Sequence, residues 1–301
     1  MRHLTKRLAS LLIGGALTVA VGGSTAATAD GRAGVGARGL EVAVPAYALP
    51  GSAMLTAALS ASPAPAVVVL NPDSGDAPFD AAWQAQADAL RGRTTAVGGR
   101  TKVLGYVNTS HGAPSLDDVE AVVDNYLRTA DHRLHVDGIF FDQTGRDCGD
   151  ADVTRNYYAT LRSYVQEAVY RLDPDARDLV VDNPGTAVAD CYLEADHRTA
   201  DVFVTYEGSY ADYTGGGWLG GNVFNDDAGY YSGAAFDPAG TSFWHLVDAV
   251  PDAAAMRTAL DTAFTRGAGY AYATDDDLPD PWDSEPSWGF SSETSHAAAL
   301  G

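Results

Sequence analysis

Residues 136–143 read Val-Asp-Gly-Ile-Phe-Phe-Asp-Gln, a short apolar run that ends on a carboxylate and an amide. Its Val, Ile and Phe residues are typical of a buried β-strand. Seven further runs of this kind occur along the chain, and helix-like segments separate most of them: residues 40–47, 66–71, 102–109, 178–183, 201–207, 241–248 and 270–275. Eight strands alternating with crossovers, over about 270 residues, predict a single α/β domain with the (β/α)8 TIM-like barrel fold.

Three of the intervening segments have the pattern of helices. Residues 153–172 place apolar side chains on one face, and Asp173-Pro174 then stops the helix. Residues 115–127 begin with a serine cap, and residues 253–266 end before a glycine. Residues 208–240 lack a helical period and form either a long functional loop or a poorly formed crossover. A doubly wound open sheet is the alternative fold, but no Gly-x-Gly-x-x-Gly motif follows a strand.

The charge and the cysteine count exclude several classes of function. The 301 residues carry a net charge of −21 and include two cysteines. Such a chain is repelled by a polyanion, so nucleic acid is not an expected partner. The sequence has no Gly-x-Ser-x-Gly motif of a serine hydrolase, and its His, Cys and acidic residues lack zinc spacing. We therefore expect no metal and no cofactor.

The N-terminus has the three parts of a secretory signal peptide. Residues 1–7 are basic, residues 8–23 are apolar, and Ala27-Thr28-Ala29 forms an A-x-A cleavage signal. A membrane anchor is the alternative, but four glycines interrupt the short apolar stretch. The pattern predicts a signal peptide over residues 1–29, cleaved after Ala29, and a secreted protein.

The remaining chain is divided into a flexible leader over residues 30–39 and the barrel domain over residues 40–301. No later segment approaches 18 uninterrupted apolar residues, so no membrane contact is expected after cleavage. We expect a monomer. Export also permits a disulfide.

In a (β/α)8 barrel the carboxyl ends of the strands carry the functional site. Here these ends hold carboxylates, amides and aromatic side chains: Tyr47, Asn71, Asn108, Asp142, Gln143, Asn183, Glu207, His245, Asp275 and Asp276. Barrels that process glycans need two carboxyl groups for catalysis, and neutral polar groups to hold sugar hydroxyls. The strand ends therefore predict a carbohydrate site.

Asp142 and Glu207 are the candidate catalytic residues. Asp142 follows two phenylalanines, which favours partial desolvation and a raised pKa. Glu207 closes the run over residues 201–207 in the same manner. The alternatives are a capping aspartate and a solvated rim acid. Residues 275–277 are three consecutive acids, more typical of a solvated loop.

The motifs at the strand ends together resemble the spherulation-specific family 4 (spherulin-4-like) proteins. The matching pieces occur in order: Val44-Pro45-Ala46-Tyr47, Asn71-Pro72-Asp73-Ser74-Gly75, Gly105-Tyr106-Val107-Asn108-Thr109, Asp137-Gly138-Ile139-Phe140-Phe141-Asp142, Asn183-Pro184-Gly185-Thr186, Tyr206-Glu207-Gly208-Ser209-Tyr210, Thr274-Asp275-Asp276 and Pro281-Trp282. They span about residues 40–290, which is most of the chain.

This resemblance implies a (β/α)8 glycoside hydrolase, similar to glycoside hydrolase family 135. Fungal members cleave galactosaminogalactan, an α-linked polymer of galactose and partly deacetylated N-acetylgalactosamine. Their activity depends on an Asp-Glu pair after the fourth strand and a Glu after the sixth. By motif these positions are Asp142, Gln143 and Glu207. Because Gln143 is not an acid, two hypotheses stay open: a glycosidase that needs only two carboxylates, and a non-catalytic carbohydrate-binding or cell-surface protein.

Ten residues are expected to bind substrate. The tyrosines offer rings that stack on sugar faces, and the amides and the remaining polar groups offer hydrogen bonds. Tight turns are the alternative explanation for the Asn-Pro pieces, and barrel packing is the alternative for Tyr106. The ten residues are Tyr47, Asn71, Tyr106, Asn108, Gln143, Asn183, Tyr206, Tyr210, His245 and Asp275.

Two further expectations concern the loops at the same end of the barrel. Cys148 follows the fourth strand and Cys191 the fifth, so the two cysteines are predicted to form a disulfide.

Acidic residues gather in the predicted cleft, and acidic clefts attract cations. Partly deacetylated galactosamine polymers are cationic, so a cationic polysaccharide is the expected substrate, although acidity for solubility is the alternative. The cleft acids are Asp142, Glu207, Asp275 and Asp276, with Asp212, Asp226 and Asp227 in the long loop.

Overall fold

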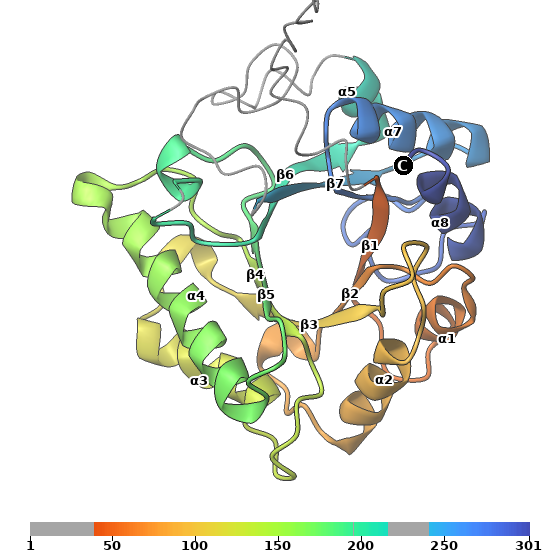
Figure 1. Ribbon diagram of the computed structural model, residues 1–301. Coiled ribbons are helices and arrows are strands. Elements are labelled where there is room, and N and C mark those ends of the chain that lie inside the picture. Colours follow the sequence, from red (N-terminus) through yellow and green to blue (C-terminus); the bar gives the residue numbers. More distant parts are fainter. Residues whose placement is uncertain (1–38, 195, 216–240) are drawn as a thin grey trace, which may run out of the picture. The chain divides into compact units, whose positions relative to one another are not determined.

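The computed structural model describes residues 39–194, 196–215 and 241–301. Within these residues, eight parallel strands close into a barrel in chain order (Figure 1). The predicted (β/α)8 fold is therefore confirmed, and the open doubly wound sheet is wrong. The strands are β1 (Glu41–Ala46), β2 (Val67–Leu70), β3 (Lys102–Asn108), β4 (Gly138–Asp142), β5 (Leu179–Asn183), β6 (Val202–Ser209), β7 (Ser242–Asp248) and β8 (Tyr270–Ala273).

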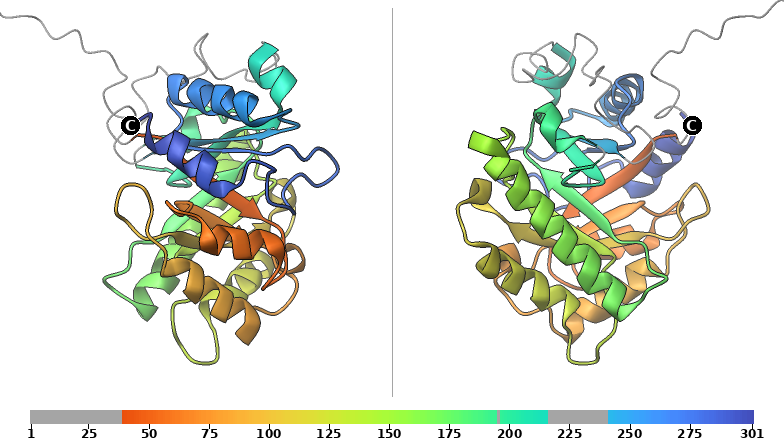
Figure 2. Two further views of the ribbon diagram at one scale, coloured as in Figure 1. Left: turned by 90° about the vertical axis from the view of Figure 1, so that its right-hand side faces the viewer. Right: turned by 60° about the vertical axis from the view of Figure 1, so that its left-hand side comes forward.

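Helices lie around the outside of the barrel (Figure 2). They are α1 (Ala53–Ser60), α2 (Ala81–Arg91), α3 (Leu116–Leu127), α4 (Val153–Leu172), α5 (Tyr210–Gly215), α7 (Ala253–Thr265) and α8 (Phe290–Ala298). Short 3-10 turns follow some strands, namely η1 (Asp73–Gly75), η2 (Ser110–Gly112), η3 (Asp150–Asp152) and η4 (Asp190–Tyr192). In the part of the chain that the structure describes, no helix has the length and apolarity needed to cross a bilayer.

The three predicted helices are confirmed as α3, α4 and α7. The Ser115 side chain accepts a hydrogen bond from the backbone N–H of Asp118 and so caps α3. Asp252 caps α7 in the same way, through Ala254 and Ala255. Of the segment 208–240, only its first residues are described, in the end of β6 and in α5. The expected signal peptide and residues 226 and 227 lie outside the described residues.

The carboxyl end of β4 is in register with the carboxyl ends of the neighbouring strands β3 and β5. Asp142 pairs with Asn108 of β3 and with Asn183 of β5. Paired residues of neighbouring strands share a face of the sheet, so these three side chains lie together at the mouth of the barrel. At the other end of β4, a Cβ atom on Gly138 would stand 1.9 Å from the Leu179 carbonyl oxygen, so only glycine allows β4 and β5 to approach here.

Strand β6 contains an irregularity that decides which of its residues reach the mouth. Its pairing with β7 shifts between Val204 and Tyr206, so β6 has an extra residue at this point. The shift exchanges inward and outward positions for the rest of the strand. Glu207 therefore faces the mouth, where it contacts Asn183, whereas the ring of Tyr206 packs against Tyr213 of α5.

Candidate active site

A single amide joins the two candidate carboxylates. Asn183 Nδ2 donates to Asp142 Oδ1 at 2.7 Å and to Glu207 Oε2 at 2.8 Å. Because both bonds start from one nitrogen atom, the two carboxylate oxygens lie at most 5.5 Å apart, the sum of 2.7 and 2.8 Å. The structure therefore brings together the ends of β4, β5 and β6 around a pair of acids.

Both carboxylate oxygens of Asp142 are hydrogen-bonded. The second, Oδ2, accepts the hydroxyl of Tyr106 at 2.6 Å. Burial raises the pKa of Asp142, and the hydrogen bonds from Tyr106, Gln143 N–H and Asn183 oppose that rise. Burial and the charge of Asp142 also raise the pKa of Tyr106, so its hydroxyl keeps its proton and remains a donor.

Glu207 is accessible to solvent at the mouth while protein surrounds it on the other sides. Desolvation raises the pKa of Glu207 to about 7; the hydrogen bond from Asn183 lowers it and the charge of Asp142 adds to the rise. A carboxyl group with this pKa exchanges its proton near neutral pH, which suits a general acid or base. Its other oxygen, Oε1, accepts the indole N–H of Trp282 at 3.3 Å.

Trp282 is a residue that sequence reasoning did not assign to the site. It lies in the segment between β8 and α8, is 4% exposed and packs against Tyr272 with ring centroids 5.9 Å apart. Its carbonyl oxygen accepts the backbone N–H of Tyr47 at 2.9 Å. The only signal in the sequence was its place in the Pro281-Trp282 piece of the family motif.

Tyr47 and Asn71 directly follow the carboxyl ends of β1 and β2. The ring of Tyr47 meets that of Tyr106 edge-on, with centroids 5.3 Å apart. Burial, followed by the charges of Asp142 and other nearby acids, raises the pKa of Tyr47. Within the described residues, the buried Oδ1 of Asn71 has no hydrogen-bond partner. An unpaired buried acceptor at the carboxyl end of β2 is open to a ligand donor.

Asn108 and Gln143 shape the turns beside Asp142. Asn108 Oδ1 accepts the backbone N–H of Ser110 at 2.8 Å, so this amide oxygen supports the turn after β3. Gln143 has φ 50°, a left-handed conformation, and its side chain is exposed. Its carbonyl oxygen accepts the backbone N–H of His111 at 2.7 Å. Gln143 thus follows Asp142 directly and has an exposed side chain.

His245 and Tyr206 lie away from the acids, which corrects the expectation that they line the mouth. His245 is 1% exposed, and its Nδ1 lies 2.7 Å from the hydroxyl of Tyr213 on α5. Burial, with the nearby charge of Arg266, lowers the pKa of His245 to about 3, so the ring stays neutral. The shift in β6 turns Tyr206 outward, away from the mouth. The hydroxyl of Tyr206 donates to the carbonyl oxygen of Ser209 at 2.8 Å.

The remaining predicted residues lie at the rim. Tyr210 begins α5 and is half-buried. Asp275 is exposed, and its Oδ1 accepts the backbone N–H of Ser287 at 3.1 Å. The neighbouring Asp276 accepts the hydroxyl of Ser284. These two aspartates therefore hold the segment that carries Trp282 in place.

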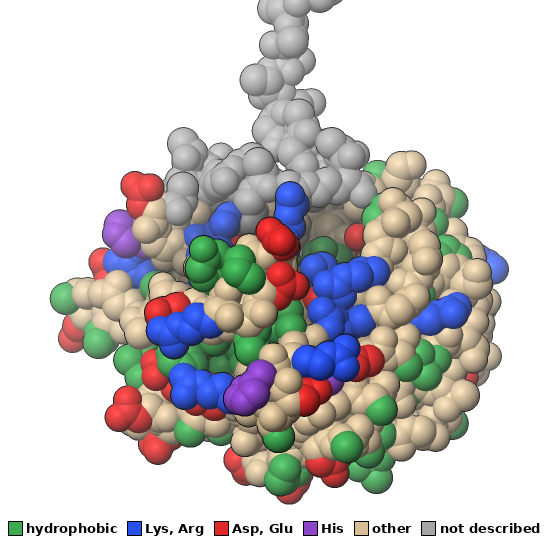
Figure 3. Space-filling model, turned by 60° about the horizontal axis from the view of Figure 1, so that its bottom comes forward, with side chains coloured by type: hydrophobic (Ala, Val, Ile, Leu, Met, Phe, Trp, Pro, Cys, Tyr) green, Lys and Arg blue, Asp and Glu red, His purple; other side chains and the backbone are tan. Residues whose placement is uncertain are grey.

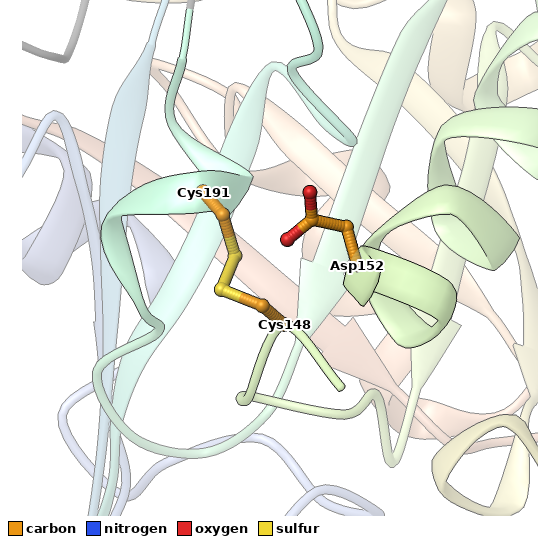
Figure 4. A group of neighbouring side chains, drawn as sticks. All are labelled: Cys148, Asp152 and Cys191. Carbon is orange, nitrogen blue, oxygen red and sulfur yellow. A yellow bond between two sulfur atoms is a disulfide. The ribbon is translucent and has the colours of Figure 1, made fainter. Parts of the chain in front are cut away.

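The predicted disulfide between Cys148 and Cys191 is present (Figure 4). It joins the loop after β4 to the loop after β5 and closes a stretch of 43 residues. In the chain-entropy view such a cross-link stabilises a fold by about 3–4 kcal/mol. Asp152 lies beside it, but the two sulfur atoms are bonded to each other and Asp152 pairs with Arg155, so this group is a cross-link rather than a set of metal ligands.

Charge is unevenly distributed over the barrel. Seen from the side of α2 and α3, Lys and Arg side chains gather on the surface (Figure 3). At the amino ends of β3 and β4, Arg91, Arg100 and Lys102 form ion pairs with the buried Asp137. At the carboxyl end of β7, the charges of Asp277 and Asp212 add to the effect of burial and raise the pKa of Asp248.

A model of the family described as "Spherulation-specific family 4" matches residues 41–293. The chain belongs to spherulation-specific family 4. The curated relative spherulin-4 of Physarum polycephalum is 29% identical to this family member over 125 residues, which are 41% of the chain and 36% of spherulin-4. The match thus spans about a third of that relative's length.

Among solved structures, this family 4 chain is similar to Aspergillus clavatus Sph3, whose crystal structure is of a complex with GalNAc. The two superpose with a TM-score of 0.65 at 21% identity, over 87% of this chain and 99% of Sph3. Likeness at this level of identity establishes a shared fold.

Proposed function

We propose that this protein is a glycoside hydrolase that cleaves an amino-sugar polysaccharide, with Asp142 and Glu207 as its catalytic carboxylates. The observation that carries the proposal is the hydrogen bonding of both carboxylates to the one side-chain nitrogen of Asn183. Glycosidases use such a pair of acids on either side of the scissile bond.

Glu207 is assigned the general acid/base role because its pKa of about 7 lets it give and take a proton near neutral pH. Asp142 is assigned the role of nucleophile or charge stabiliser, since hydrogen bonds from Tyr106 and Asn183 support its ionised form. Carboxyl groups about 5–5.5 Å apart are typical of retaining enzymes, and the oxygens held by Asn183 are no further apart than that.

The proposed substrate contains N-acetylgalactosamine or galactosamine. GalNAc is the ligand of Sph3, which shares the fold and nearly its whole length with this chain. We assign substrate contacts to Tyr106, which bonds to Asp142, and to Gln143, which directly follows it. Tyr47 packs against Tyr106, and Asn71 has an unpaired acceptor at the end of β2, so both are assigned substrate contacts as well. The acids near Asp248 favour a polymer with free amino groups.

A non-catalytic carbohydrate-binding protein is the second candidate. It is favoured by Gln143, a neutral residue at the position where the resemblance implies an acid. Measurement of reducing ends released from acetylated and partly deacetylated galactosamine polymers distinguishes the two. Release supports the hydrolase, whereas retention on the immobilised polymer without any release supports the binding protein.

Export is part of the proposal. A signal peptide over residues 1–29 delivers the protein to the outside, with a leader over residues 30–39 before the barrel of residues 40–301. N-terminal sequencing of protein recovered from culture medium tests cleavage after Ala29. Light scattering of the same sample tests the expected monomer.

A further inference from the structure

A cavity of about 490 Å³ lies among the turns that follow β3, β4 and β5, and several of its lining residues are close in sequence to Asp142 and Asn183. Its lining includes His111, Thr144, Arg146, Asp147 and Pro184. Thr144 follows Asp142 by two residues, Pro184 directly follows Asn183, and the charge of His111 acts on Asp142. The volume lies within the usual range of sites for small ligands.

The walls of this cavity are fixed before any ligand arrives. The backbone N–H of Gly145 donates to the hydroxyl of Tyr158 at 2.8 Å, and the N–H of Ala189 donates to the carbonyl oxygen of Arg146 at 2.9 Å. The disulfide of Cys148 joins the same two loops. A preformed wall lowers the ordering cost of binding.

The polar groups of the cavity suit a neutral, hydroxyl-rich ligand. Arg146 and Asp147 are exposed, and within the described residues neither side chain has a hydrogen-bond or ion-pair partner. Together they offer charged hydrogen-bond donors and charged acceptors at one place. A bare cation pairs only with the acceptors and a bare anion only with the donors, whereas a hydroxyl group uses both. The hydroxyl of Thr144 is likewise unpaired within the described residues, and Pro184 supplies an apolar surface.

We propose that this cavity binds a second sugar residue of the polysaccharide, next to the residue held between Asp142 and Glu207. The inference rests on the proposed function, because it places the chain of a polymer along the turns after β3 to β5. Its chemistry is recognition of sugar hydroxyls by Arg146 and Asp147, whose charge-assisted hydrogen bonds are the strong ones.

The test compares ligand length in two neutral double variants. The first, R146A/D147A, removes one positive and one negative side chain from the cavity. The control, E167A/R171A, removes an exposed pair of opposite charge from α4. Neither changes the net charge. Calorimetry measures the Kd of N-acetylgalactosamine and of its α-linked oligomers of two and four residues, all in an E207Q background in which cleavage is expected to be at least about 100-fold slower.

In the E207Q parent and in the control, the Kd is expected to fall at least about tenfold from one residue to two, as added charge-assisted bonds predict. In R146A/D147A the monosaccharide Kd stays within about threefold of the parent value and that gain is lost. Circular dichroism confirms the fold of each variant.

Three outcomes contradict the inference. Equal Kd values at every length in the parent, or an undiminished gain in R146A/D147A, overturn the second sugar site and leave the hydrolase proposal standing. Loss of monosaccharide binding in R146A/D147A makes the cavity the primary site instead of a second one. If the wild-type protein neither binds nor cleaves any of these sugars, the proposed function itself fails.

Discussion

Trp282 donates its indole N–H to Glu207 Oε1 at 3.3 Å, although 75 residues separate the two along the chain. The bond forms because the segment between β8 and α8 returns over the mouth, where the N–H of Tyr47 donates to the Trp282 carbonyl oxygen. It stabilises the ionised form of Glu207 and so lowers a pKa that burial raises.

Replacement of Trp282 by phenylalanine keeps an aromatic ring and removes this donor. The pKa of Glu207 is expected to rise further, and the alkaline limb of the pH profile of kcat/KM moves to higher pH with it. The matched control is Trp83→Phe, a buried tryptophan on α2. An unchanged limb in W282F contradicts the assigned role of the bond.

The amide variants Asp142→Asn and Glu207→Gln are expected to reduce hydrolysis by at least about 100-fold, within the usual range for acid–base groups. The controls are Asp175→Asn and Glu167→Gln, which make the same chemical change at exposed acids. These two residues are distant in sequence from Asp142 and Glu207. The measurement is release of reducing ends under single-turnover conditions. Full activity in both D142N and E207Q removes these residues from the mechanism.

The short separation across Asn183 predicts retention of the anomeric configuration. Proton nuclear magnetic resonance of the first product formed distinguishes the anomers before they interconvert. Initial appearance of the α-anomer from an α-linked polymer is expected. An initial β-anomer indicates that water attacks directly and contradicts the retaining assignment.

The acids at the carboxyl end predict a salt-dependent preference for a cationic polymer. Between about 20 and 500 mM salt, screening is expected to reduce kcat/KM strongly for partly deacetylated galactosamine polymer and little for the fully acetylated polymer. The same enzyme sample is compared on both polymers. An equal response to salt assigns the acidity to solubility alone.

Glu293 on α8 predicts a loss of stability as the pH rises. It is fully buried, and burial raises its pKa from 4.5 to about 8, although the N–H of Ala273 bonds to it at 2.8 Å. Between these pH values the folded protein holds a proton that the unfolded chain has released. The contribution of this proton to the free energy of unfolding is complete below pH 4.5. It is lost as the pH rises towards 8, at up to about 1.4 kcal/mol per pH unit.

Glu293→Gln removes this proton while keeping an acceptor for Ala273. Urea unfolding at pH 5 and pH 8 should therefore show a smaller difference in the free energy of unfolding for E293Q than for the wild type. The exposed Glu285→Gln is the control and should match the wild type. Identical pH dependence in E293Q and the wild type contradicts a raised pKa of Glu293.

Local sequence patterns determined the elements of the barrel. Apolar runs of strand length, the Ser115 cap and the Asp173-Pro174 stop predicted strands and helices close to the observed bounds, because burial and capping depend on residues near in sequence. The order of the strands also placed Cys148 and Cys191 in neighbouring loops, which was enough to pair them.

Only the tertiary structure decided which polar residues meet at the mouth. The shift between Val204 and Tyr206 turns Glu207 inward and Tyr206 outward, and nothing in the alternation of β6 alone reveals it. The contact of Trp282 with Glu207 depends equally on a segment 75 residues away. Strand register and the return of a distant segment are set by packing across the whole barrel, so they are absent from any local pattern.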